Sequence, residues 1–173
     1  ELLCAQENLT VDKGASRACA SEREMFSQFL SYFHQMQFDI IIGWNTLNFD
    51  MRYIYQRCKM LGLGTQVRQM GKWNFVDHPS KGEASLPPLL DVTLSTAGAG
   101  HNQFRYWTIS GVFQMDELVV VRRDKKYDSY KLGAVSQILL GDQKMDEPPS
   151  EIHRKSQGTA TDLAEIVAYC MKD

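Results

Sequence analysis

A strand, a polar turn and a helix follow one another in residues 38–54, FDIIIGWNTLNFDMRYI, and this order constrains the fold most. The β-branched run III at 40–42 predicts a strand over 38–43 that is buried on both faces. A glycine ends this strand, and apolar residues at helical spacing predict a helix over about 50–61. Upstream, the capping-box pattern SERE and an apolar stripe predict a helix over about 22–36. Helix, buried strand, turn and helix together indicate an α/β fold.

Composition and charge exclude some partners and locations. The chain has 173 residues, 43% hydrophobic and 23% charged, which is ordinary for a globular domain. Its net charge of −2 provides no overall basic field, so a nucleic acid would have to meet a local patch or other parts of a longer protein. No apolar run approaches the roughly 20 residues of a membrane span, and no signal-peptide pattern is present, so we expect no membrane partner and no secretion. The four cysteines show no C-x-x-C spacing, and we expect Cys58 and Cys170 to be buried, reduced thiols.

The second half of the chain differs from the first in its patterning. Residues 62–110 mix Gly, Pro, Ser and aromatic residues without sustained periodicity, which predicts an irregular insertion that could hold a hairpin. From 111 onwards, GVFQM predicts a strand, and LGAVSQILL followed by Gly141 predicts a helix. The stretch DEPPS is expected to be a loop, and a final apolar stripe predicts a helix over about 160–173.

Two places in the sequence could carry chemistry. Asp50 follows the carboxyl end of the predicted strand, where open α/β sheets bind ligands. A carboxylate at this place could also have only a structural role, in which its negative charge stabilises the start of the helix. Asn45 and Asn48 could be residues that only form the turn. Tyr169 and Asp173 are spaced i, i+4 and share one helical face, where they could also be ordinary surface residues. The residues alone leave these alternatives open.

Two quoted stretches together resemble a known family. GWNTLNFDMRYIYQRCKMLGL resembles the second exonuclease motif of family B DNA polymerases, Asn-x-x-x-Phe-Asp before a Tyr-containing helix, and YCMKD resembles the third, Tyr-x-x-x-Asp. Between them, VFQMDELVVVRRDKKYDSYKLGAVSQILLGDQKMD resembles the family's strand, basic stretch, S-Y-x-L helix and L-G-x-x-K-x-D segment. The pattern is most similar to the eukaryotic replicative polymerases and those of large DNA viruses.

This resemblance implies a fold class and a domain organisation. The implied fold is α/β, the RNase H-like fold of DEDDy exonucleases, in which helices flank a mixed sheet. Residues 1–173 would form one fragment of a 3′–5′ exonuclease domain, with 62–110 as an insertion within it. The chain starts at Glu1 without Met, and no Asp-x-Glu, the family's first motif, occurs before residue 21. We therefore expect an N-terminally truncated fragment that is inactive alone and lacks both the first motif and the polymerase domain.

The resemblance also assigns catalytic groups. Asp50 and Asp173 would be ligands of Mg²⁺ (or Mn²⁺), with two ions in the complete site. The hydroxyl of Tyr169 would hydrogen-bond the attacking water, and Lys144 would lie near the scissile phosphate. Lys144 could equally be an ordinary solvent-exposed lysine that follows the C-terminus of a helix. The implied reaction is hydrolysis of the 3′-terminal phosphodiester of a mispaired primer.

DNA is the implied partner, together with the polymerase domain of the same chain. Asn45 and Phe49 would contact the frayed primer end, Phe49 by packing on a base or sugar. Sliding clamps or accessory subunits are conceivable partners that the sequence does not specify. The implied location is a eukaryotic nucleus or a viral replication site. Two alternatives stay open: a stand-alone DEDDy exonuclease, and a catalytically dead nucleic-acid-binding module of the same fold.

Overall fold

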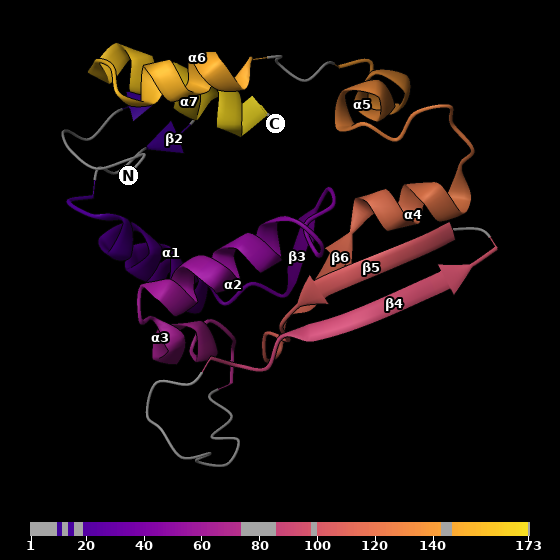
Figure 1. Ribbon diagram of the computed structural model, residues 1–173, viewed down its shortest axis with the longest axis horizontal. Helices are drawn as coiled ribbons and strands as arrows, with labels where there is room; N and C mark the ends of the chain where they lie inside the picture. The colour runs from indigo at the N-terminus through magenta and orange to yellow at the C-terminus, as the bar shows by residue number, and fades with distance from the viewer. Residues whose placement is uncertain are drawn as a thin grey trace. The chain divides into compact units, whose positions relative to one another are not determined.

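The chain divides into two compact units (Figure 1). The central unit is Phe26–Tyr130, and the terminal unit combines Glu1–Met25 with Lys131–Asp173. No helix in the described parts of the chain is long and apolar enough to cross a bilayer. The computed structural model describes residues 10–11, 14–15, 19–73, 86–97, 100–142 and 147–172.

Helix α1 (Glu22–Met36) confirms the helix predicted from the capping-box pattern. The hydroxyl of Ser21 accepts a hydrogen bond from the Glu24 N–H at 3.1 Å, which satisfies one of the donors left free at a helix start. The Glu24 carboxylate accepts in return from the Ala20 N–H at 2.8 Å. The apolar stripe buries Phe26 and Leu30, and Leu30 is only 1% exposed.

Strand β3 (Ile40–Gly43) pairs in parallel with β6 (Phe113–Asp116). In this register Ile40 lies opposite Phe113, and Gly43 lies opposite Asp116. The prediction that β3 is buried on both faces is wrong, because Ile40 and Ile42 are 52% and 58% exposed. Alternate side chains of a strand point to opposite faces, so the described residues leave one face of β3 open.

Helix α2 (Asp50–Met60) confirms the helix predicted after the turn. Met51 and Cys58 are its buried residues, and Cys58 has no exposed surface. Burial raises the pKa of the Cys58 thiol to about 11, so this cysteine is a protonated thiol at neutral pH, in agreement with the prediction. After α2 the chain turns through Gly62, which has a φ of +67°, into the short helix α3 (Gly64–Arg68).

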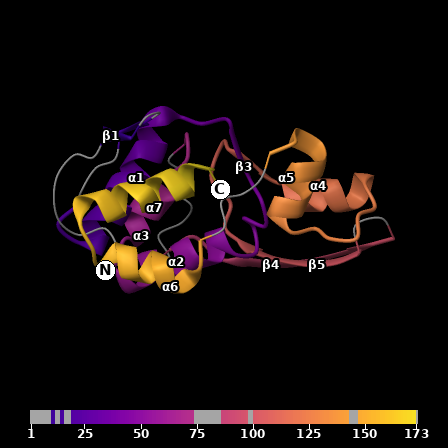
Figure 2. The ribbon, with the colours of Figure 1, turned by 90° about the horizontal axis from the view of Figure 1, so that it is seen from above.

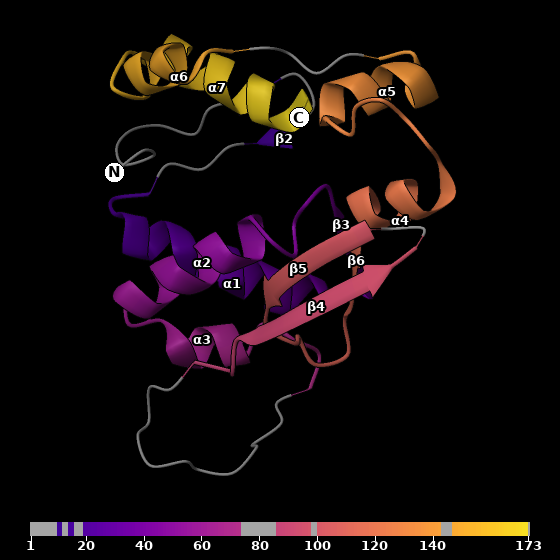
Figure 3. The same ribbon diagram turned by 45° about the vertical axis from the view of Figure 1, so that its right-hand side comes forward.

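A long hairpin lies within the segment 62–110, where the sequence predicts an irregular insertion that could hold one. Its strands β4 (Leu90–Thr96) and β5 (Gly100–Tyr106) are antiparallel, with Leu90 opposite Tyr106 (Figure 3). The chain leaves β5 into Trp107, which is 1% exposed and lies with its ring 5.9 Å from that of Tyr55 on α2. This contact joins the base of the hairpin to α2.

Helix α4 (Glu117–Asp124) follows β6 directly and covers one face of the hairpin (Figure 2). It buries Leu118 and Val121. Arg122, in the basic stretch VRRDKK, turns back onto the hairpin. Its guanidinium donates to the Asn102 side-chain oxygen at 3.0 Å and lies 5.5 Å from the centre of the Tyr130 ring. Arg122 is therefore a packing residue of the central unit.

The terminal unit contains two short paired strands and three helices in its described parts. The strands are β1 (Thr10–Val11) and β2 (Gly14–Ala15), and the helices are α5 (Leu132–Leu140), α6 (Pro149–Ser156) and α7 (Ala160–Lys172). Helix α6 begins inside DEPPS, where the sequence predicts a loop, because proline is favourable in the first turn of a helix. Helix α7 confirms the final predicted helix, but Cys170 is exposed, so its predicted burial is wrong.

Candidate active site

A tight turn after β3 carries the predicted site residues Asn45 and Phe49. Asn45 has a φ of +60°, which an asparagine adopts more readily than most residues. Its carbonyl oxygen accepts from the Phe49 N–H at 3.0 Å, and the Thr46 carbonyl accepts from the Met51 N–H at 2.9 Å. These two bonds carry the chain from the turn into α2, so the turn determines where α2 begins.

Gly43 allows this turn to fold back over the end of β3. A β-carbon added at Gly43 would lie 1.8 Å from the Thr46 hydroxyl oxygen, which is far inside contact distance. Glycine is therefore needed at position 43 because the Thr46 side chain lies so close to it, and not because the backbone has a positive φ.

Changing Gly43 to alanine is expected to destabilise the central unit by about 1–3 kcal/mol, because the Thr46 side chain must move to admit a methyl group. Hydrogen exchange on peptides from α2, measured by mass spectrometry, reports this loss. Adding Thr46→Ala should restore much of the protection, since it removes the nearest clashing atom. An unchanged loss in the double variant would mean that the methyl group strains another part of the turn.

Asp116, at the end of β6, is a buried carboxylate that the sequence analysis did not select. It is 5% exposed. One carboxylate oxygen accepts from the N–H groups of Asn45 at 2.9 Å and Leu118 at 3.1 Å, and the other accepts from the Leu47 N–H at 3.1 Å. The signal that could have found it is FQMDELVV, in which an aspartate follows an apolar strand and opens a helix.

Asp50 is the first residue of α2 and lies near enough to Asp116 to be affected by its charge. Asp50 is an exposed residue, but the protein around its carboxylate removes some of the solvent and so raises its pKa above the ordinary 3.8. A hydrogen bond from its own backbone lowers this pKa, and the charge of Asp116 raises it again. The ionised form of Asp50 is therefore less favourable here than in water. A bound cation would offset this cost, and carboxylate oxygens are the ligands that hard divalent cations prefer. Asp50 thus fits a metal ligand.

Only some of the predicted site residues can be placed. Phe49 precedes α2 and is 69% exposed, whereas Asn45 is half-buried in the turn. Tyr169 is half-buried on α7 in the terminal unit. Lys144 and Asp173 lie outside the described residues. The predicted meeting of Asp50, Tyr169 and Asp173 therefore stays a prediction. In the described ranges no three His, Cys, Asp or Glu side chains form a cluster that could hold a metal.

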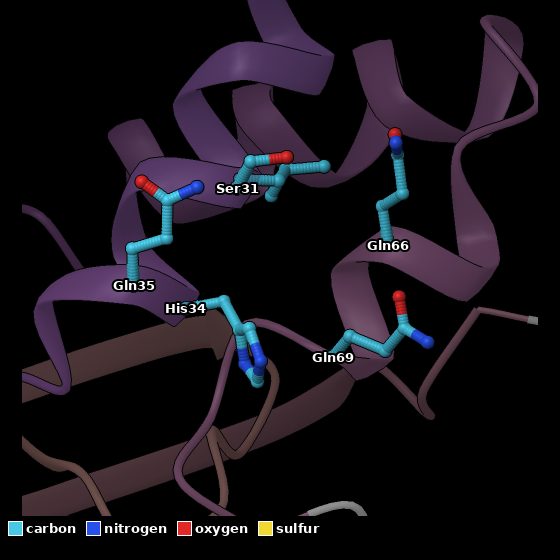
Figure 4. A pocket seen from close by; sticks show the side chains of 6 residues that line it. Ser31, His34, Gln35, Gln66 and Gln69 are labelled. Carbon is cyan, nitrogen blue, oxygen red and sulfur yellow. The ribbon is translucent and has the colours of Figure 1, made fainter.

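A small cavity of about 160 Å³ lies elsewhere in the central unit, between α1 and α3 (Figure 4). Its lining is mostly neutral and polar, and the Gln66 amide in it donates to the Ser27 hydroxyl at 2.8 Å. The lining contains no carboxylate and none of the turn residues, so this cavity does not belong to the candidate site. The residues that line it are Leu30, Ser31, His34, Gln35, Gln66 and Gln69.

Comparison with known proteins identifies the family. Residues 5–135 match the exonuclease domain of DNA polymerase family B. The chain belongs to this family. The match spans the turn, α2 and Asp116, and it confirms the family indicated by the quoted motifs. The RNase H-like fold of this exonuclease family also confirms the predicted fold class.

Relatives of this family come from viruses and eukaryotes. A DNA polymerase of Paramecium bursaria Chlorella virus NY2A is 30% identical over 99% of this chain. The DNA polymerase delta catalytic subunits of Candida albicans and Caenorhabditis elegans are 31% and 32% identical over 88% and 90% of it. The chain spans 18%, 14% and 13% of the lengths of these three relatives.

Proposed function

We propose that this chain is the proofreading 3′–5′ exonuclease region of a family B DNA polymerase, which removes a mispaired nucleotide from the primer end. The observation that carries the proposal is the turn from Gly43 to Asp50, which presents the Asp50 carboxylate beyond the end of β3. The family match over residues 5–135 supports it. The length of the relatives supports a role within a polymerase over a stand-alone exonuclease.

In this proposal Asp50 and Asp173 hold two Mg²⁺ (or Mn²⁺) ions. When bound, such ions supply a hydroxide nucleophile near neutral pH and stabilise the charge on the leaving oxygen. Tyr169 orients the attacking water through its hydroxyl, and Lys144 lies near the scissile phosphate. Because the hydroxyl of Tyr169 both donates and accepts a hydrogen bond, it can hold a water in one orientation.

The DNA contacts are assigned to the turn itself. Phe49 stacks on the frayed primer end, and its exposure of 69% supports this role because a buried ring could not meet a base. Asn45, near the start of the same turn, contacts the same primer end. The DNA partner is a single-stranded 3′ end beside a primer–template duplex, and the site of action is the nucleus or a viral replication site.

Removal of divalent metal is expected to stop excision by the polymerase that carries this chain. With a primer labelled at its 5′ end and mispaired at its 3′ end, Mg²⁺ should give stepwise shortening from the 3′ end. Chelation with EDTA should lower the rate by at least ~100-fold, and excess Mg²⁺ should restore it. Gel electrophoresis of the labelled primer measures both rates. A polymerase that binds this DNA but shortens it with neither Mg²⁺ nor Mn²⁺ would indicate a catalytically dead binding module.

A further inference from the structure

We infer that Asp116 is a positioning residue of the proposed exonuclease site, because its carboxylate holds the backbone of the turn from which Asp50 is presented. The inference rests on the proposed function. It concerns a residue that touches neither the primer nor the metal and acts through the turn.

Asp116 is too enclosed to be a metal ligand itself. Its residue is 5% exposed, and both carboxylate oxygens already accept hydrogen bonds from three backbone N–H groups. One oxygen accepts two of these bonds and the other accepts one, and the surrounding protein leaves the carboxylate little exposed surface. A carboxylate used in this way stabilises a backbone conformation.

The hydrogen bonds of Asp116 reach beyond its own helix. The bond to the Leu118 N–H is a local cap at the start of α4, which a single oxygen satisfies. The bonds to Asn45 and Leu47 cross 71 and 69 residues of sequence. The parallel register makes this possible, because it pairs Gly43 with Asp116 and so places the carboxylate at the base of the turn. A helix cap alone would not need the second oxygen.

The turn is held from a second strand as well. The Leu47 carbonyl accepts a hydrogen bond from the Arg105 N–H of β5 at 2.9 Å. Leu47 is thus fixed on both sides, through its N–H by Asp116 and through its carbonyl by β5. The Asn45 carbonyl then accepts a hydrogen bond from the Phe49 N–H just before α2, and the Thr46 carbonyl accepts one from the Met51 N–H in its first turn. A shift of the turn therefore moves the first residue of α2, which is Asp50.

An asparagine at 116 could not reproduce this arrangement. A carboxylate offers two acceptor oxygens, whereas an amide offers one oxygen and one donor group. In either orientation of the amide, its NH₂ group would face a backbone N–H of Asn45 or of Leu47. Since both groups donate, one side of the turn would lose its hydrogen bond.

The test is Asp116→Asn in the polymerase that carries this chain, with excision of a mispaired 3′ end measured in single turnover across a Mg²⁺ titration. We expect the excision rate to fall about 10–100-fold and the Mg²⁺ concentration for half-maximal rate to rise several-fold, as for other residues that orient metal ligands. Primer extension by the same enzyme should be unchanged. Asp39→Asn is the matched control, because Asp39 lies just before β3 and forms an exposed ion pair with Lys72. Loss of this ion pair should change the excision rate less than about twofold.

Excision rate and Mg²⁺ requirement both within twofold of wild type would overturn the inference. A lower rate with an unchanged Mg²⁺ requirement would also overturn it, because Asp116 would then support packing in general. Asp50→Asn separates the two claims: excision by that variant above about a tenth of the wild-type rate would contradict the metal-ligand role of Asp50 in the proposed function, whatever Asp116→Asn does.

A measurement on the wild-type polymerase covers the case in which Asp116→Asn does not fold. Hydrogen exchange on peptides containing residues 44–49 should show protected amides, although these residues belong to a turn and not to a helix or strand. Exchange as fast as in an unstructured peptide would overturn the inference.

Discussion

Replacing Asp50 with asparagine is expected to lower the rate of 3′-terminal excision by about 10³-fold. Asparagine has nearly the same size but lacks the negative charge that a divalent cation requires, and loss of a metal contact is worth several kcal/mol of transition-state stabilisation. About 1.4 kcal/mol corresponds to each tenfold change in rate. Single-turnover excision of a mispaired primer by the polymerase that carries this chain measures the effect.

The stability of the Asp50→Asn variant separates lost chemistry from lost folding. The pKa of Asp50 is raised in the folded chain, so the folded state binds this proton more tightly than the unfolded chain does. Ionisation at neutral pH therefore costs stability, and a neutral asparagine removes that cost. We expect hydrogen exchange in α2 to be unchanged or slower. Excision above about a tenth of the wild-type rate would favour the simpler role of Asp50 as a charge at a helix start.

Replacing Trp107 with alanine is expected to be the most destabilising single change in the central unit, at about 3–5 kcal/mol. The side chain is 1% exposed, and its ring lies 5.9 Å from that of Tyr55. The Trp107 backbone carbonyl accepts a hydrogen bond from the Gln114 side chain of β6 at 3.0 Å, which places β6 beside this residue. Truncation would leave a cavity where the hairpin, α2 and β6 meet.

Hydrogen exchange of the most protected amides in Phe26–Tyr130 measures this loss as a change in the free energy of opening. Trp73→Ala is the matched control, because Trp73 belongs to the same unit but is 60% exposed. Its loss should cost less than about 1 kcal/mol. Equal losses in the two variants would mean that the Trp107 side chain is not part of the core that holds the unit together.

Local patterns were sufficient to predict the elements around the site. The capping box before α1 and the apolar spacing in α1, α2 and α7 depend on residues within a few positions of one another, so they can be recognised without knowing the fold. The sequence pattern does not predict helix α6, because two prolines lie at its start, few of its residues are apolar and none of them is buried. The exposure of Ile40 and Ile42 was missed because burial depends on what covers a strand.

The family, the helix–strand–turn–helix order around the site and the candidate residues Asn45, Phe49 and Asp50 follow from local sequence, because the motif that joins them is contiguous. What holds these residues in place depends on contacts between segments that are far apart in the chain. Asp116 and the backbone of β5 meet the turn because β3 pairs with β6 and the hairpin packs on α2. Hydrogen bonds across 71 and 69 residues follow from that pairing and leave no periodic trace in the sequence.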